Sequence, residues 1–132
     1  MSELEQKLKQ LYEQGVVKET AKQRISELKE VEEIIPQMKK DKQLIKLLKL
    51  YKALGNKNRL LILWLIIKGV RCACEIEHLL NLSQSTVSHH INTLVEVGAI
   101  ESMKSGKWNL VKSNNFEYSK ELFIKMIEKI FE

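Results

Sequence analysis

The chain has 132 residues, of which 44% are apolar and 30% are charged, and its formal net charge is +5. This length suffices for one compact domain with an appendage, and the composition excludes an intrinsically disordered protein. Residues 60–67 form the most apolar run, far short of the roughly 18–20 residues of a membrane span. The charged N-terminus is no secretory signal, and two cysteines cannot form a disulfide framework. We therefore expect a cytoplasmic protein without a membrane partner, whose basic charge favours nucleic acid.

The first forty residues show helical periodicity with little apolar surface. Leucines recur at helical spacing before Gly15, and a second narrow apolar stripe comes after it, comprising Ala21, Ile25, Leu28, Val31 and Ile35. So narrow a stripe is typical of a coiled-coil seam, and it is too short to be stable alone. We predict that residues 1–40 form a helical extension that reinforces a dimer or binds a partner, and that Pro36 divides it from the rest of the chain.

Residues 41–132 predict a mainly α fold that ends in a small β-hairpin and a last helix. The expected helices are residues 44–54, 59–68 with Asn58 as N-cap, 75–80, the segment from Ser83 to Gly98, and 117–130. Between the last two, residues 100–103 and 108–112 alternate as strands around a turn at 104–107. This order of elements predicts a winged helix-turn-helix, with residues 41–132 as the DNA-binding domain.

The helix that begins after Ser83 carries a polar face that packing does not explain. Its buried stripe is Val87, Ile91 and Leu94, and its opposite face holds Ser, Thr, Gln, His and Asn instead of the usual Lys and Glu. Such side chains hydrogen-bond base edges and phosphates. The predicted DNA contacts are Ser83, Gln84, Ser85, Thr86, Ser88, His89, His90, Asn92, Arg59, and the hairpin residues Lys104 and Lys107. For Arg59 a structural ion pair is an equal alternative, and one histidine can pack or cap while the other contacts phosphate.

Several separated motifs resemble those of the ArsR/SmtB family of metal-responsive repressors. Residues 54–60 are similar to the start of the family's second helix, 82–91 to its recognition helix, and 94–100 with 106–108 to its wing. The resemblance covers about residues 44–113 and leaves residues 1–40 outside. It implies a homodimer, paired through the first and last core helices, that occupies a palindromic operator in double-stranded DNA. It also implies a repressor that leaves this operator when an effector binds.

Cys72 and Cys74 align with two cysteines of that family's metal box, which implies a soft ion such as As(III), Sb(III), Cd(II) or Zn(II). Residues two apart on a regular helix point about 200° from one another, so chelation requires the first turn to unwind. His78, four residues after Cys74, is a candidate third ligand. Arg71 replaces the acidic first residue of the box, and no third cysteine exists. Metal binding, thiol oxidation and simple packing therefore stay open for this pair.

The sequence offers little support for an enzyme. Ser88 and His89 are adjacent, which is the wrong geometry for a nucleophile and its base on a helix, and there is no Gly-rich phosphate loop. The alternative to an effector-released repressor is a winged-helix protein with no metal response. Such a protein would act as a constitutive DNA-binding or protein-interaction module through its N-terminal helices.

Overall fold

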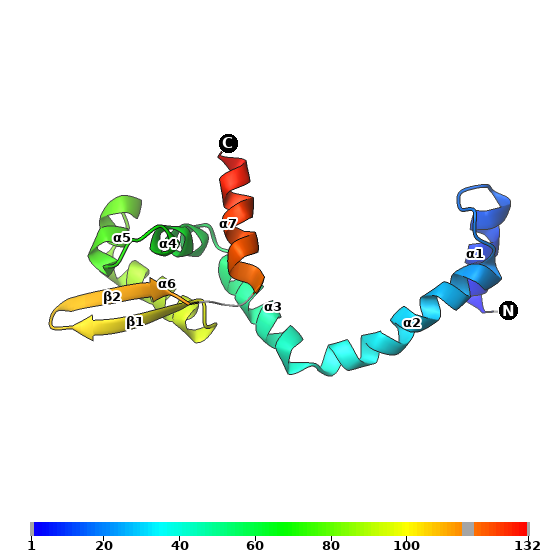
Figure 1. Cartoon of the computed structure of the whole chain (residues 1–132), viewed down its shortest axis with the longest axis horizontal. Coiled ribbons are helices and arrows are strands. Elements are labelled where there is room, and N and C mark those ends of the chain that lie inside the picture. The colour runs from blue at the N-terminus through cyan, green and yellow to red at the C-terminus, as the bar shows by residue number, and fades with distance from the viewer. Residues whose placement is uncertain (1, 115–117, 132) are drawn as a thin grey trace. The chain divides into compact units, whose positions relative to one another are not determined.

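The computed structural model describes residues 2–114 and 118–131, which form two compact units, Met1–Leu44 and Ile45–Glu132 (Figure 1). The helices are α1 (Glu3–Glu13), α2 (Ala21–Lys40), α3 (Lys42–Leu54), α4 (Lys57–Ile67), α5 (Ala73–Leu80), α6 (Gln84–Glu96) and α7 (Tyr118–Ile130). The strands are β1 (Ile100–Ser105) and β2 (Trp108–Ser113). The mainly α fold with a hairpin wing is therefore confirmed. None of the helices in the described residues is long and apolar enough to cross a membrane.

In the first unit, α1 packs against α2. Ser2 caps α1, and Thr20 with Gln23 forms a capping box at the start of α2. The contact half-buries Leu8, Ile25 and Leu28, but neither helix contains a fully buried residue. The C-terminal half of the apolar stripe of α2 remains open to solvent. The role predicted for residues 1–40 stays a prediction.

Pro36 lies inside α2 and does not end it, so the expected division of the chain at this proline is wrong. A proline within a helix removes one backbone hydrogen bond, here to the carbonyl of Glu32, four residues earlier. Four good helix formers come after it, and the helix continues to Lys40. Asp41 ends α2, and its carboxylate accepts a 2.7 Å hydrogen bond from the backbone N–H of Gln43 at the start of α3.

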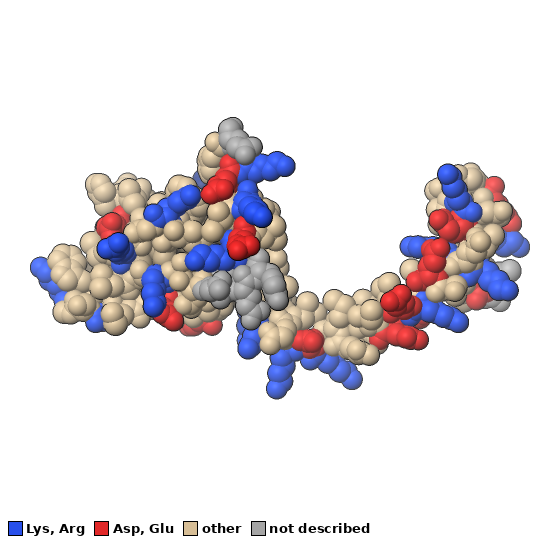
Figure 2. Space-filling view, in the orientation of Figure 1, with Lys and Arg blue, Asp and Glu red and all other residues tan. Residues whose placement is uncertain are grey.

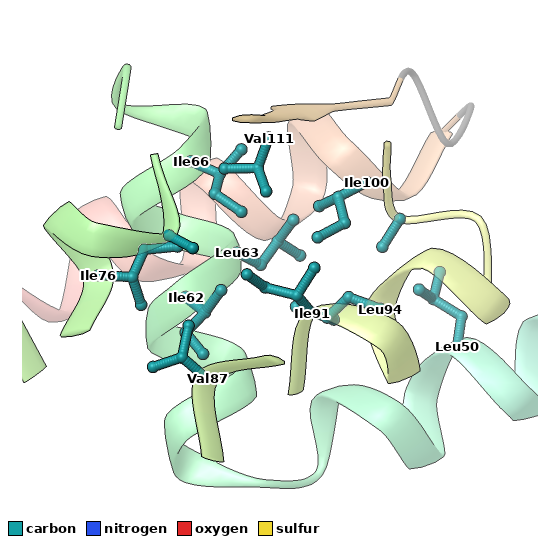
Figure 3. Packing of buried hydrophobic residues seen from close by; sticks show 12 residues of the cluster. Leu50, Ile62, Leu63, Ile66, Ile76, Val87, Ile91, Leu94, Ile100 and Val111 are labelled. Atoms are coloured by element: carbon teal, nitrogen blue, oxygen red, sulfur yellow. The ribbon is translucent and has the colours of Figure 1, made fainter. Parts of the chain in front are cut away.

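The second unit is built around one hydrophobic core to which α3, α4, α5, α6, β1 and β2 all contribute (Figure 3). Its most deeply buried side chains include Ile62, Leu63, Ile76, Ile91 and Leu94, each 0% exposed. Burying one such side chain stabilises the fold by about 1.5–3 kcal/mol. Val87, Ile91 and Leu94 form the buried stripe of α6, as their spacing predicts, and they turn its polar face outward.

One left-handed residue and one N-cap define the turn between α5 and α6, the two helices of the helix-turn-helix. Asn81, at φ +53°, ends α5, and Ser83 caps α6 by accepting a 3.2 Å hydrogen bond from the backbone N–H of Thr86. The Ser83 cap is thus confirmed. The cap of α4 was expected at Asn58 but lies at Asn56, whose side chain accepts from the N–H of Arg59. Helix α4 consequently begins two residues earlier than expected.

The wing is an antiparallel hairpin whose register runs from Ile100 opposite Ser113 to Ser105 opposite Trp108. Its turn consists of Gly106, at the positive φ of +60° that a tight hairpin turn requires, and Lys107. The turn is shorter than the expected 104–107, and Lys104 therefore lies on β1. A bridge between Cys72 and Leu110 adds the segment before α5 to the edge of this sheet.

Candidate nucleic-acid interface

Helix α6 presents a continuous polar surface from Gln84 to Asn92. Gln84, Ser85, His89 and Asn92 are exposed, and Thr86 and Ser88 are half-buried. The Ser83 hydroxyl donates to Thr86 Oγ1 at 2.8 Å and lies 3.2 Å from Ser85 Oγ, so three hydroxyls at the helix start are held together. The cap therefore fixes the side chains of Ser83 and Thr86 at the start of the helix, next to the exposed polar side chains of the first two turns.

His90 lies in the core and not on this polar surface, because it is only 7% exposed. Arg59 Nη1 lies 3.4 Å from His90 Nδ1, and Arg59 Nε donates a 2.6 Å hydrogen bond to the carbonyl of Ala53. Burial, aided by the nearby charges of Arg59 and His89, lowers the pKa of His90. A neutral imidazole can accept a hydrogen bond from the guanidinium. Because its ring is turned inward, His90 is withdrawn from the predicted DNA contacts.

Arg59 has a structural role, and among the described residues it forms no ion pair. Its side chain is half-buried and joins three helices, since Ala53 belongs to α3, Arg59 to α4 and His90 to α6. The guanidinium satisfies the carbonyl of Ala53, a buried residue near the C-terminus of α3. Phosphate binding by Arg59 stays a prediction.

The tip of the wing is basic. Lys104 and Lys107 are exposed, and Lys107 Nζ lies 5.0 Å from the ring centroid of Trp108, which is itself 49% exposed. Figure 2 shows Lys and Arg atoms at the tip of the β1–β2 hairpin. Sequence reasoning missed Trp108 as a functional candidate, although an aromatic residue next to a lysine in a hairpin turn is a recognisable signal.

A cleft of about 450 Å³ separates the wing from the start of α5 and from α6. Its lining includes the residues predicted for DNA and for an effector, namely Cys72, Cys74, Gln84, Ser88, Lys104 and Lys107. Trp108 and Asn109 complete the side formed by the wing. The fold thus gathers both predicted sites around one cavity.

Cys72 is the N-cap of α5 and lies outside the helix, with the extended backbone angles φ −121° and ψ 140°. Its Sγ accepts a 3.3 Å hydrogen bond from the backbone N–H of Cys74, and the Glu75 carboxylate accepts from the N–H of Cys72 at 3.0 Å. The 200° separation of residues two apart on a regular helix therefore does not apply to this pair.

Cys74 is exposed and Cys72 half-buried, so both thiols border the cleft. A side-chain hydrogen bond between the thiols of Cys74 and Cys72, together with the smaller effect of desolvation, raises the pKa of Cys74 above its ordinary value. Among the described residues, no group of three or more His, Cys, Asp or Glu side chains is placed to hold a metal ion, so His78 does not join the cysteines. Two thiols fall short of the four ligands of a closed soft-metal site such as that of zinc.

Three comparisons place this geometry among known proteins. Residues 56–102, from the cap of α4 into β1, match the family model described as "Bacterial regulatory protein, arsR family". An uncharacterized HTH-type transcriptional regulator of Methanocaldococcus jannaschii is 41% identical over 61 residues, covering 46% of this chain and 68% of that protein. The cadmium resistance transcriptional regulatory protein CadC of Listeria innocua is 36% identical over 58 residues, 43% of this chain and 49% of its own length. The match thus spans about half of CadC.

Solved structures agree on the fold. A possible transcriptional regulatory protein of Mycobacterium bovis is 26% identical, with a TM-score of 0.60 over 70% of this chain and 99% of that chain. A solution structure of the same fragment is described as a homodimeric winged helix-turn-helix DNA-binding domain. It is 23% identical, has a TM-score of 0.53, and covers 67% of this chain and 77% of that chain.

Proposed function

Because the chain belongs to the ArsR family of winged helix-turn-helix transcriptional regulators, we propose that it is a homodimeric repressor that binds a palindromic operator. The observation that carries this proposal is the exposed polar surface of α6 beside the lysines of the wing. Neither element needs these side chains for its own packing, and together they match what a DNA duplex offers, namely base edges in one groove and phosphates beside it.

In this proposal the first two turns of α6 enter the major groove. Gln84, Ser85, Ser88, His89 and Asn92 then face base edges or phosphates, and Gln84 can pair with adenine through two hydrogen bonds. Lys104 and Lys107 reach the flanking phosphates or the minor groove. Ser83 and Thr86 contribute mainly by holding the helix start in place, with backbone N–H groups available to a phosphate.

The dimer is proposed from two exposed apolar surfaces in the second unit. On α3, Ile45, Leu47, Leu48 and Tyr51 are 37–54% exposed, and on α7, Leu122, Met126 and Ile130 are 53–72% exposed. A hollow of about 550 Å³ with a mostly apolar lining lies between α4 and α7. A second copy that covers these surfaces would place two recognition helices on one duplex, with half-sites about one helical turn apart.

The effector is proposed to be a thiophilic agent that reacts with Cys72 and Cys74, either a soft metal or metalloid ion such as As(III), Cd(II) or Zn(II), or an oxidant. Support comes from the position of both thiols on the cleft that Gln84, Ser88, Lys104 and Lys107 also line. An occupant of this cleft would lie against residues that face DNA. It would also disturb the N-cap of α5, the helix that leads into the recognition helix.

The test has two stages. Selection from random double-stranded DNA and measurement of fluorescence anisotropy should yield a palindrome bound by the full chain. The complex is then titrated with As(III), Cd(II), Zn(II) and an oxidant, using the native protein and the Cys72→Ser, Cys74→Ser variant. Release of the native protein alone supports the effector site. Binding without any release would favour the constitutive module, and failure to select any sequence would overturn the proposed repressor.

A further inference from the structure

The C-terminal half of α2 carries an apolar stripe that nothing in the described residues covers. Val31, Ile34, Ile35 and Met38 are 41–54% exposed, although α1 half-buries the preceding part of the same stripe. We propose that this surface pairs in an antiparallel manner with α2 of a second copy of the chain. The contact is separate from the α3 and α7 surfaces and does not rest on DNA binding.

The spacing of the stripe is that of a two-stranded coiled coil. If Leu28 and Ile35 occupy a positions, Val31 and Met38 fall on d, and Glu32 and Lys39 both fall on e. Pro36 falls on b, about 150° from the centre of the stripe, so the proline ring does not enter the seam. Of this set only Leu28 is half-buried within its own chain.

Charge along α2 selects the antiparallel orientation and one register. Figure 2 shows acidic atoms along the middle of α2 and basic atoms toward the end that leads into α3. In antiparallel pairs the e positions of the two helices face one another. Packing Val31 against Ile35 of the second copy places Glu32 opposite Lys39 of that copy, and symmetry repeats this contact. A shift by one heptad in either direction would place Lys39 against Lys39 or Glu32 against Glu32.

The residues at the g positions, on the other side of the a and d residues, also fit this register. Ile34 falls on g and meets its own counterpart at the two-fold axis, which explains an apolar residue at a position that is usually charged. The other g residues are Glu27 and Asp41, and both carboxylates are engaged within their own chain. Arg24 Nη1 lies 2.8 Å from Glu27 Oε2, and Asp41 accepts from the N–H of Gln43. Repulsion between them is therefore reduced.

Cross-linking of the full chain tests the pairing. In a Cys72→Ser, Cys74→Ser background, Ile34→Cys places one thiol on the predicted two-fold axis, and Glu33→Cys places it one residue away on the far side of the helix. We expect a short bis-maleimide to join two chains of the Ile34→Cys protein on the order of tenfold faster than two chains of the Glu33→Cys control. Both positions are exposed, so neither change should affect folding.

Charge reversal then tests the register. Adding Glu32→Lys or Lys39→Glu to Ile34→Cys should slow cross-linking on the order of tenfold, because each change places like charges opposite at two symmetric contacts. The double reversal should restore the rate, and so should a mixture of the two single variants, in which both contacts are again attractive. Equal rates for the two cysteine positions, or no effect of charge reversal, would overturn the proposal. The cross-linking measurement needs no DNA. If the chain cross-links as expected but selects no operator, the α2 pairing is supported and the proposed repressor is refuted.

Discussion

The backbone N–H of Val111 donates a 2.8 Å hydrogen bond to the carbonyl oxygen of Arg71. Val111 is a buried residue of the wing strand β2, and Arg71 directly precedes Cys72, which bridges to Leu110. The segment that caps α5 is therefore also an edge of the wing sheet. A ligand that displaces the backbone at Cys72 would act on the wing and on α5 together, which is how we expect thiol chemistry to reach both proposed DNA contacts.

Cys72 is predicted to stabilise the fold as a helix cap, whatever it binds. Cys72→Ala removes the acceptor for the N–H of Cys74, whereas Cys72→Ser supplies a preferred capping oxygen. We expect the alanine variant to have a free energy of unfolding about 0.5–2 kcal/mol below that of the serine variant, measured by urea denaturation. Equal stabilities would show that a side-chain acceptor at position 72 does not stabilise the start of α5.

Alkylation kinetics should reveal the raised pKa of Cys74. Because the thiolate is the reactive form, a raised pKa means that Cys74 reacts more slowly near pH 8 than an ordinary exposed thiol. The largest cause is the hydrogen bond between the Cys72 and Cys74 side chains, so Cys72→Ala should shift the pH–rate profile of Cys74 toward lower pH. Iodoacetamide labelling with peptide mass spectrometry measures this profile. An unchanged profile in the alanine variant would assign the shift to another cause.

Acid should destabilise the second unit through His90. Its pKa is lowered in the folded state, mainly by burial and then by the charge of Arg59, so the unfolded chain takes up a proton at a higher pH than the folded one. Stability is therefore fully present above the unfolded value of about 6.5 and is lost as pH falls from there toward the folded pKa. Urea unfolding between pH 5 and 8 should show this slope, and His90→Gln should flatten it. An equal slope in both proteins would contradict this assignment.

Local signals account for the parts of the fold that the sequence predicts correctly. Ser83 and the stripe of Val87, Ile91 and Leu94 determine α6 within a single helix, and Gly106 marks the hairpin turn. The sequence offers two asparagines, Asn56 and Asn58, as possible caps of α4, and local signals do not distinguish them. In the structure α4 begins at Lys57, so Asn56 is the cap. Similarly, Pro36 predicts a helix end from local sequence, but good helix formers lie on both sides of it and α2 continues to Lys40.

The candidate site was harder to predict because its details depend on contacts between elements. Buried His90 contacts Arg59, which lies 31 residues earlier on α4. Helical spacing alone places His90 only at the edge of the polar face. The residue that caps α5, Cys72, likewise forms a bridge to Leu110, 38 residues later in the wing. Side chains that face solvent, such as Gln84 and Lys107, can be predicted from periodicity, whereas those at the junctions of helices cannot.

Gln84 is predicted to read sequence. Because an amide that pairs with adenine through two hydrogen bonds loses both when truncated, Gln84→Ala should reduce discrimination against a substituted base pair by about 1–3 kcal/mol. Competition between the selected operator and its single-base variants, monitored by anisotropy, measures this loss. Gln10→Ala, which removes an exposed amide on α1 outside the proposed DNA contacts, is the matched control and should leave the discrimination unchanged. Unaltered discrimination in Gln84→Ala would remove this residue from the groove.

Lys107 is predicted to contact phosphate without reading sequence. Lys107→Ala should therefore weaken binding to operator and random DNA alike, and it should reduce the slope of log affinity against log salt by about 1. Lys112 on the same hairpin is the matched control, because its Nζ lies 3.2 Å from Glu101 Oε2 and Lys112→Ala should leave the slope unchanged. The measurement is an anisotropy titration at several salt concentrations. If the loss were confined to the operator, Lys107 would be reading bases; if the slope did not change, the tip of the wing would not touch DNA.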